Sequence, residues 1–134
     1  MITRAELDEY QSLLSERDEL KERLERKRAQ VYTIKTQNFS AVPGGHGDVD
    51  RIGAAVAQLE ELEIYYCEKK MECSRRLNKI EKELKRLDDI EQKILRYRYI
   101  DGLWWKEICV KVDYAWAQVH RIHRKSLTKL QHNS

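Results

Sequence analysis

Apolar residues recur at helical spacing through most of the chain. Residues 3–37 contain neither Gly nor Pro, and apolar residues return there every three or four positions, which places them on one side of a helix. The series is Tyr10, Leu13, Leu20, Leu24, Val31 and Ile34, interrupted by Arg17 and Lys27. Most other positions are Glu, Arg or Lys. This pattern predicts a long helix that carries a coiled-coil seam with two polar breaks.

A second stretch, starting at residue 48 or 50 and ending near 87–89, repeats the pattern. Its seam has eleven positions, and all but Glu63 and Lys70 are apolar. The positions are Ile52, Val56, Leu59, Glu63, Tyr66, Lys70, Cys73, Leu77, Ile80, Leu84 and Leu87. Residues 38–48 between the stretches hold the single Pro and three of the five Gly, which predicts a loop. Residues 1–89 should therefore form an antiparallel helical hairpin, and the same seams could recruit a second copy into a homodimer.

After residue 89 the pattern changes to three shorter helices, expected at residues 90–100, 103–112 and 115–130. Turn signals separate them at Asp101-Gly102 and Asp113-Tyr114. The residues expected to form one small core are Ile94, Leu95, Ile100, Leu103, Trp105, Ile108, Val112, Val119, Ile122, Leu127 and Leu130. The predicted fold is all-α: a hairpin domain at 1–89, followed by a three-helix domain at 90–134 whose last two helices form a helix-turn-helix.

Charge is distributed unevenly between the two predicted domains. Residues 1–90 hold 17 basic and 19 acidic side chains, a net charge of −2, whereas residues 91–134 hold 9 and 4, a net charge of +5. From residue 117 onward there are four basic residues and no acid, and three of the four His also lie there. A positive segment of this kind indicates a polyanion partner.

Composition narrows the class of protein. A chain of 134 residues with 37% charged and 41% hydrophobic residues and one Pro is typical of a helix-rich protein that is too small for a large enzyme fold. No apolar run exceeds four residues, whereas a bilayer crossing needs roughly 18. The acidic N-terminus is unlike a signal peptide, so no membrane association and a cytoplasmic location are expected. The three Cys lack a Cys-x-x-Cys pair and should be small buried apolar residues.

The sequence carries no recognisable motif for catalysis or cofactor binding. The chain shows neither a nucleophile with its base nor a two-His-plus-Glu helix motif, so an enzyme is not expected. The Gly-rich loop does not end in Gly-Lys-Ser/Thr, which leaves no basis for a nucleotide cofactor. His120 and His123 could supply two metal ligands, but no further ligand lies nearby in sequence, so no metal site is predicted.

Two segments of the C-terminal domain resemble a known family. Residues 94–108 read Ile-Leu-Arg-Tyr-Arg-Tyr-Ile-Asp-Gly-Leu-Trp-Trp-Lys-Glu-Ile, and residues 118–127 read Gln-Val-His-Arg-Ile-His-Arg-Lys-Ser-Leu. They resemble region 4 of sigma-70-type factors and, more closely, the phage-encoded ArpU/RinA-type transcriptional regulators. The resemblance implies a sequence-specific regulator of phage or prophage late genes that binds double-stranded promoter DNA in the bacterial host cell. The hairpin would then serve self-association or contact with RNA polymerase.

The resemblance also implies which residues contact DNA. With the recognition helix at residues 115–130 in the major groove, the reading face falls on Trp116, Ala117, Gln118, His120 and Arg121. Arg121 can bond guanine O6 and N7, Gln118 can bond adenine N6 and N7, and Trp116 can contact a thymine methyl or a sugar edge. The residues expected at phosphates are Arg124, Lys125 and Lys129, supported by Lys106 and Lys111 of the preceding helix.

The chain departs from this family at three positions. Trp104 and Ala115 stand where Ser or Thr is common, and Asp113 stands where Gly is usual. Trp116 is a large aromatic residue at the exposed start of a helix, so it should either contact DNA or pack on another group. The alternative function is a coiled-coil structural or adaptor protein that uses its basic C-terminal unit to bind a protein partner.

Overall fold

The structure, a computed structural model, describes residues 1–39 and 46–132. Its elements, in chain order, are α1 (Arg4–Phe39), α2 (His46–Leu84), α3 (Asp89–Leu95), the π-helix η1 (Arg96–Ile100), α4 (Trp105–Val112) and α5 (Trp116–Gln131). No strand occurs in these two ranges, which confirms the all-α prediction. None of the helices within them combines the length and apolar character that a bilayer crossing requires.

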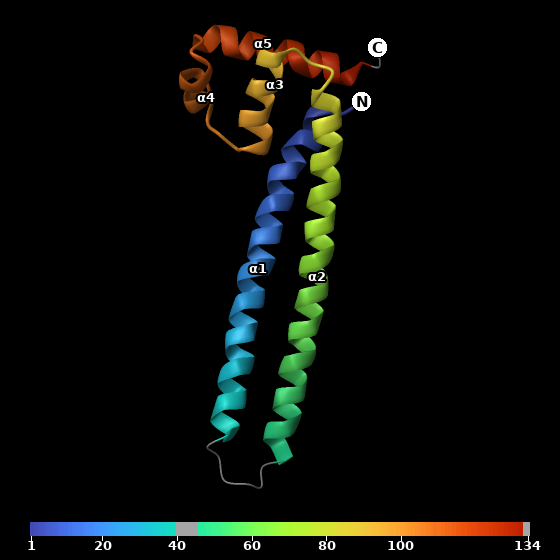
Figure 1. Cartoon of the computed structure of the whole chain (residues 1–134), viewed down its shortest axis with the longest axis vertical. Helices are drawn as coiled ribbons and strands as arrows, with labels where there is room; N and C mark the ends of the chain where they lie inside the picture. Colours follow the sequence, from blue (N-terminus) through green and yellow to red (C-terminus); the bar gives the residue numbers. More distant parts are fainter. Residues whose placement is uncertain (40–45, 133–134) are drawn as a thin grey trace. The chain divides into compact units, whose positions relative to one another are not determined.

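The two long helices form the predicted antiparallel hairpin (Figure 1). The loop predicted at residues 38–48 is too long, because α1 continues to Phe39 and α2 begins at His46; its remaining part, residues 40–45, lies outside the described residues. α2 also ends earlier than predicted, at Leu84. The reason for this early end is local, since Glu91 Oε1 accepts a hydrogen bond from the backbone N–H of Asp88 at 3.2 Å and so starts a new helix there.

Packing divides the described residues into two compact units. Residues 15–71 form one unit, and residues 1–14 together with 72–132 form the other. The two segments at the ends of the hairpin thus belong to the same unit as the C-terminal helices. The predicted division into domains at 1–89 and 90–134 stays a prediction.

In the unit of residues 15–71, α1 and α2 pack through their predicted seams. Val31 and Ile34 of α1 and Ala55 of α2 are buried against one another, with Ile52, Val56 and Leu59 beside them. Two ion pairs also join α1 and α2 in this unit, with Lys69 Nζ 2.8 Å from Glu16 Oε2 and Arg28 Nη2 3.6 Å from Glu63 Oε1. The apolar side chains of these seams are therefore used inside the chain.

Replacing Gly53 by Ala should stabilise this unit. A Cβ at Gly53 would meet no atom within 4 Å, and Gly in a helix interior costs about 0.5–1 kcal/mol relative to Ala. Gly53→Ala should raise the free energy of unfolding by that amount in urea titrations followed by circular dichroism. Gly102→Ala is the control of opposite sign, because Gly102 has φ +70° and its Cβ would lie 3.0 Å from Gln11 Oε1. A loss of stability in both variants would contradict the prediction.

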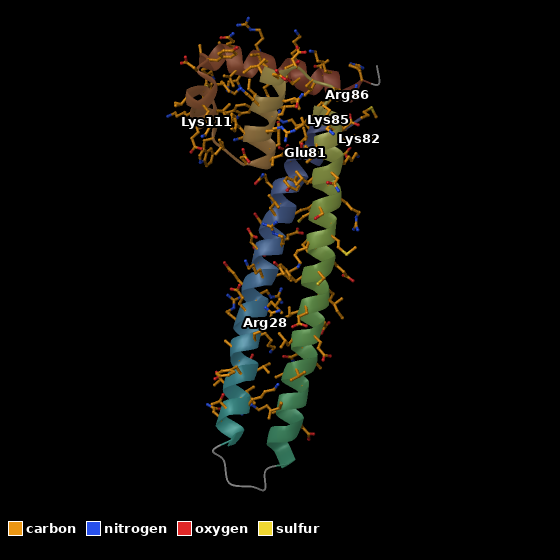
Figure 2. All side chains as sticks on the ribbon, in the orientation of Figure 1. Arg28, Glu81, Lys82, Lys85, Arg86 and Lys111 are labelled. Carbon is orange, nitrogen blue, oxygen red and sulfur yellow. The ribbon has the colours of Figure 1, made fainter. Side chains whose placement is uncertain are left out.

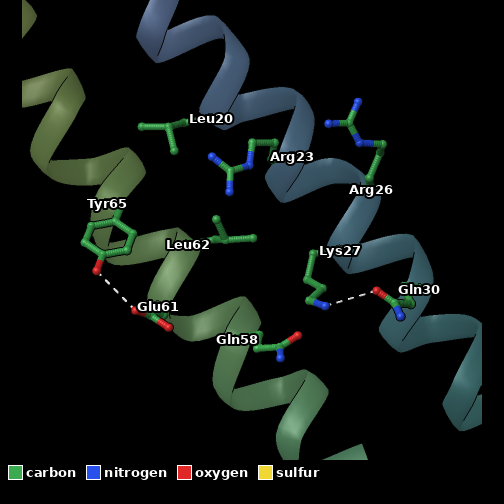
Figure 3. A pocket seen from close by; sticks show the side chains of 9 residues that line it. All are labelled: Leu20, Arg23, Arg26, Lys27, Gln30, Gln58, Glu61, Leu62 and Tyr65. Carbon is green, nitrogen blue, oxygen red and sulfur yellow. Dashed lines mark hydrogen bonds between the residues drawn. The ribbon is translucent and has the colours of Figure 1, made fainter.

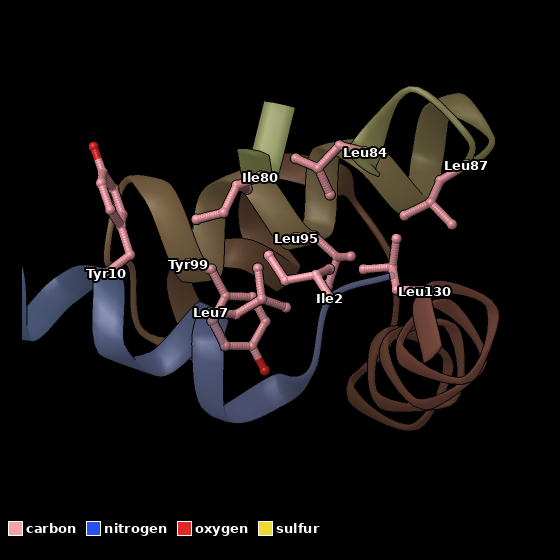
Figure 4. Packing of buried hydrophobic residues seen from close by; sticks show 9 residues of the cluster. All are labelled: Ile2, Leu7, Tyr10, Ile80, Leu84, Leu87, Leu95, Tyr99 and Leu130. Atoms are coloured by element: carbon pink, nitrogen blue, oxygen red, sulfur yellow. The ribbon is translucent and has the colours of Figure 1, made fainter. Parts of the chain in front are cut away.

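The second unit contains a core that the sequence pattern assigned differently (Figure 4). Leu95 and Leu130 were expected to pack inside the three-helix domain. They instead join residues from both ends of the hairpin, in a cluster of Ile2, Leu7, Tyr10, Ile80, Leu84, Leu87, Leu95, Tyr99 and Leu130, with Ile100 and Leu127 at its margin. The expectation of a single core was wrong because helical spacing identifies the apolar face of a helix but not the element that covers it.

A separate cluster joins α3, α4 and α5. Ile94, Ile108 and Val119 are fully buried at its centre. Asp113 follows α4 in the left-handed conformation, with φ 57° and ψ 45°, as its place in the predicted turn requires. The cysteines are only partly as predicted, since Cys73 is buried and Cys109 half-buried, but Cys67 is exposed.

Candidate nucleic-acid interface

α5 is amphipathic, and its two sides have different chemistry. Its buried side carries Val119, His123, Ser126 and Leu130, which are spaced four, three and four residues apart. Its solvent side carries most of the basic residues, and the helix contains no acidic residue. α5 therefore offers a positive face that is not needed for packing.

Five of the residues predicted to contact DNA lie on this solvent side. Trp116, Gln118, Arg121, Arg124 and Lys125 are all exposed, and Trp116 keeps 53% of its surface accessible. We call these five residues the α5 face. The major groove of DNA admits one α-helix.

His120 has different surroundings. Its ring lies between two indoles, with centroids 4.5 Å from Trp105 and 4.4 Å from Trp116. Its Nε2 atom is buried, and no group in the described part of the chain hydrogen-bonds to it. This placement does not favour His120 as a base-reading side chain. It instead supports the indole of Trp116, which packs on His120 and remains half exposed.

Lys129 is also engaged within the protein. Its Nζ lies 2.8 Å from Glu91 Oε1 and 3.7 Å from Asp88 Oδ2. Glu91 is only 3% exposed; burial by itself would raise its pKa, but hydrogen bonds from Lys129, the Asp88 backbone and Ser126 together hold the pKa below its usual value. Lys129 thus neutralises a buried carboxylate, and we leave it out of the α5 face.

Further exposed cations lie outside α5. Lys106 and Lys111 are exposed on α4, where Figure 2 labels Lys111. Lys111 Nζ lies 5.7 Å from the ring centroid of Tyr97. Lys82 and Lys85 are exposed near the end of α2 (Figure 2). The sequence did not distinguish them, because the charged positions of the hairpin all have the pattern of one solvated surface. These four lysines belong to the same unit as α5 and add positive charge to it.

His123 is buried beneath the α5 face. Its Nε2 atom and the hydroxyl of Tyr99 are hydrogen-bonded at 2.7 Å, and both residues are less than 5% exposed. Burial, and then the positive charge of Arg4 and other nearby cations, lowers the pKa of His123 to about 4. His123 is therefore neutral at pH 7 and holds η1 against α5.

The unit of residues 15–71, which we call the hairpin unit, contains a groove. It has a volume of about 520 Å³ and is lined by Leu20, Arg23, Arg26, Lys27, Gln30, Gln58, Glu61, Leu62 and Tyr65 (Figure 3). Two hydrogen bonds in the groove each join residues of a single helix: Lys27 donates to Gln30 in α1 at 3.1 Å, and Tyr65 donates to Glu61 in α2 at 3.1 Å.

Within the described ranges no three His, Cys, Asp or Glu side chains could together hold a metal ion.

The start of α5 lacks a side-chain cap, which gives a second stability prediction. Ala115 has the extended backbone of an N-cap residue, with φ −67° and ψ 152°, but its side chain cannot accept the free N–H groups of the first turn. Ala115→Ser should raise the free energy of unfolding by about 1 kcal/mol in urea titrations. Ala117→Ser places the same side chain inside α5 and should lower stability slightly. An equal change in the free energy of unfolding for both variants would show that Ser at position 115 does not cap α5.

Comparison of the chain with protein-family models, with curated proteins and with solved structures gives no match.

Proposed function

We propose that the protein is a sequence-specific DNA-binding regulator of transcription, acting on late genes of a phage or prophage. The observation that carries this proposal is the α5 face, which is exposed, positively charged and free of acidic residues. Phosphates attract such a surface without regard to sequence, and its Arg and Gln side chains can read bases. The resemblance to ArpU/RinA-type regulators supplies the phage context.

In this proposal α4 and α5 act as a helix-turn-helix, with α5 in the major groove of promoter DNA. Three observations support it: the connection between the two helices is short, Asp113 turns the chain in the left-handed conformation, and Ile108 packs with Val119. Arg121 and Gln118 would read bases. Trp116, held by His120, would contact a thymine methyl or a sugar edge.

Contacts to the phosphates would fix the position of the protein on the duplex. Arg124 and Lys125 lie further along α5 and would bind phosphates, together with Lys106 and Lys111 of α4. The hairpin would serve self-association or contact with RNA polymerase in the cytoplasm of a bacterial host. Both roles of the hairpin remain proposals.

A gel-shift titration of promoter fragments at several salt concentrations tests DNA binding. We expect sequence-specific retention, with the logarithm of the affinity falling linearly as the logarithm of the salt concentration rises. Lys125→Ala should weaken binding to all duplexes alike and reduce the salt slope by about 0.9, the value for one phosphate contact. Lys21→Ala is the matched control, because it removes an exposed lysine from the hairpin unit and should bind as the parent does.

Two outcomes would refute the proposal. Equally strong retention of unrelated duplexes would show that the protein binds DNA only through non-specific electrostatic attraction. An absence of binding at low salt would favour the alternative, an adaptor that uses the α5 face for a protein partner.

A further inference from the structure

The groove of the hairpin unit, which we call the hairpin groove, lies where the seam of α1 is interrupted (Figure 3). Lys27 lines it and occupies one of the two polar breaks in that seam. Leu20 and Leu62 also line it and are only half-buried, although Leu20 belongs to the same seam. The side chains of α1 and α2 therefore leave a space of about 520 Å³ open here.

The hairpin groove carries an excess of positive charge. Three cationic side chains of α1 line it, those of Arg23, Arg26 and Lys27, and the carboxylate of Glu61 is the one acidic group among its lining residues. Its walls thus have a net charge of +2, whereas residues 15–71 as a whole hold 10 basic and 11 acidic residues, a net charge of −1. The positive charge is therefore a property of the groove and not of its unit.

The cations of the hairpin groove lack the partner that a neighbouring cation has. Arg28 Nη2 lies 3.6 Å from Glu63 Oε1 of the facing helix. No such ion pair of Arg23, Arg26 or Lys27 occurs within the described ranges. Their charges are therefore available to a ligand.

The hydrogen bonds of the groove do not compensate this charge. Lys27 Nζ donates to the neutral amide of Gln30, and Glu61 accepts a hydrogen bond from Tyr65 of its own helix. Lys27 is half-buried, so its ammonium has lost part of its water without gaining a carboxylate. An anion in the groove would stabilise it.

We propose that the hairpin groove binds a short acidic segment of a partner protein. Carboxylates of the segment pair with Arg23 and Lys27, which extend from α1 toward α2 (Figure 3). A guanidinium can hold a carboxylate through two parallel hydrogen bonds. An apolar side chain of the segment packs on Leu20 and Leu62, where the seam is open.

The length of the hairpin groove and its amide groups favour a peptide. On α1 the groove runs from Leu20 to Gln30, which is about 15 Å at 1.5 Å per residue. Four or five residues of extended chain, at about 3.3 Å each, span this length. The side-chain amides of Gln30 and Gln58 can bond the main chain of such a segment.

A nucleoside phosphate fits the hairpin groove less well. Phosphates are commonly bound by free backbone N–H groups at the start of a helix. The lining residues come from the interior of α1 and α2, where backbone N–H groups are already bonded within the helix. The groove therefore offers side chains alone, which suit the carboxylates and apolar groups of a peptide.

Fluorescence anisotropy tests the proposal on the full chain, without DNA and so independently of the proposed function. The probe is a short fluorescein-labelled peptide with a central leucine flanked on both sides by glutamates. We expect saturable binding, which the double variant Arg23→Glu, Lys27→Glu should weaken by about tenfold or more, because two attractive contacts become repulsive. The control Lys21→Glu, Lys35→Glu makes the same change of charge at exposed lysines of α1 that do not line the groove, and it should bind as the parent does.

Two altered probes test the same contacts on the wild-type chain. Replacing the glutamates by glutamines should abolish binding, and replacing the central leucine by serine should weaken it by about tenfold, because the contact with Leu20 and Leu62 is lost. The proposal is overturned if the original probe does not bind, if either altered probe binds equally well, or if both double variants lose binding alike. Displacement of the probe by an equal concentration of ATP would assign the groove to a phosphate and would also overturn it.

Discussion

His123→Phe is expected to remove most of the stability loss that the wild-type protein undergoes between pH 6.5 and pH 4. In the folded protein the pKa of His123 is lowered to about 4, first by burial and then by nearby positive charge, from an ordinary value of 6.5. The unfolded chain therefore binds a proton in this pH range that the folded protein does not bind. Each pH unit corresponds to about 1.4 kcal/mol, which gives a total of about 3 kcal/mol.

The sign follows from the lowered pKa. The full contribution of neutral His123 to stability is present above pH 6.5, and it is lost as the pH falls through about 4. The carboxylates of Glu6, Glu83 and Glu91 also have lowered pKa values, but their ordinary value is 4.5. Their contributions are lost mainly at lower pH, so the range between pH 6.5 and 4.5 reports chiefly on His123.

Urea titrations at a series of pH values measure this effect. The wild type should lose stability steadily from pH 6.5 downward, whereas His123→Phe should give a nearly flat profile over the same range, whatever its absolute stability. His132→Gln changes an exposed histidine and should keep the wild-type slope. A flat wild-type profile, or a His123→Phe profile as steep as that of the wild type, would show that His123 is not held neutral by the fold.

Arg121→Lys is expected to lower the discrimination between specific and unrelated duplexes by about 1–3 kcal/mol, while leaving the salt dependence of binding unchanged. Both side chains carry one positive charge, but only the planar guanidinium can bond O6 and N7 of guanine as a bidentate pair. Arg121 is exposed on the α5 face, and no ion pair was found for it within the described chain. Its proposed role in base reading therefore depends on geometry more than on charge.

Arg124→Lys is the matched control for this experiment. Arg124 is exposed on the same helix, one turn further on, and is assigned to a phosphate, which a lysine can contact almost as well. Gel shifts with specific and unrelated duplexes should show that Arg124→Lys discriminates as the parent does. If Arg121→Lys also discriminated fully, Arg121 would not read a base, and the assigned orientation of α5 would be wrong.

Most of the helices could be predicted from the sequence because helical periodicity is a local property. The seam residues Val31 and Ile34 are buried as predicted, and Asp113 turns the chain between α4 and α5. The predicted helix bounds were less accurate at the loop, which was placed from its Gly and Pro content alone. Phe39 and His46 were assigned to the Gly-rich loop, but both are helical.

The candidate site was predictable to the extent that it lies on one helix. Gln118, Arg121 and Lys125 are exposed because the buried residues of α5 occupy its opposite side. Their roles in DNA binding stay predictions. The surroundings of His120 could not be predicted, because Trp105 belongs to another helix.

Local spacing and charge along the chain were thus enough to establish an all-helical protein with a hairpin and a positive C-terminal helix. The partners of individual side chains required the folded structure. Ile2 packs with Leu130, and Lys129 neutralises Glu91, across separations in sequence that leave no periodic signal. The physical reason is that the hydrophobic effect has no direction: it favours burying an apolar stripe, and the shapes of all the helices together determine what buries it.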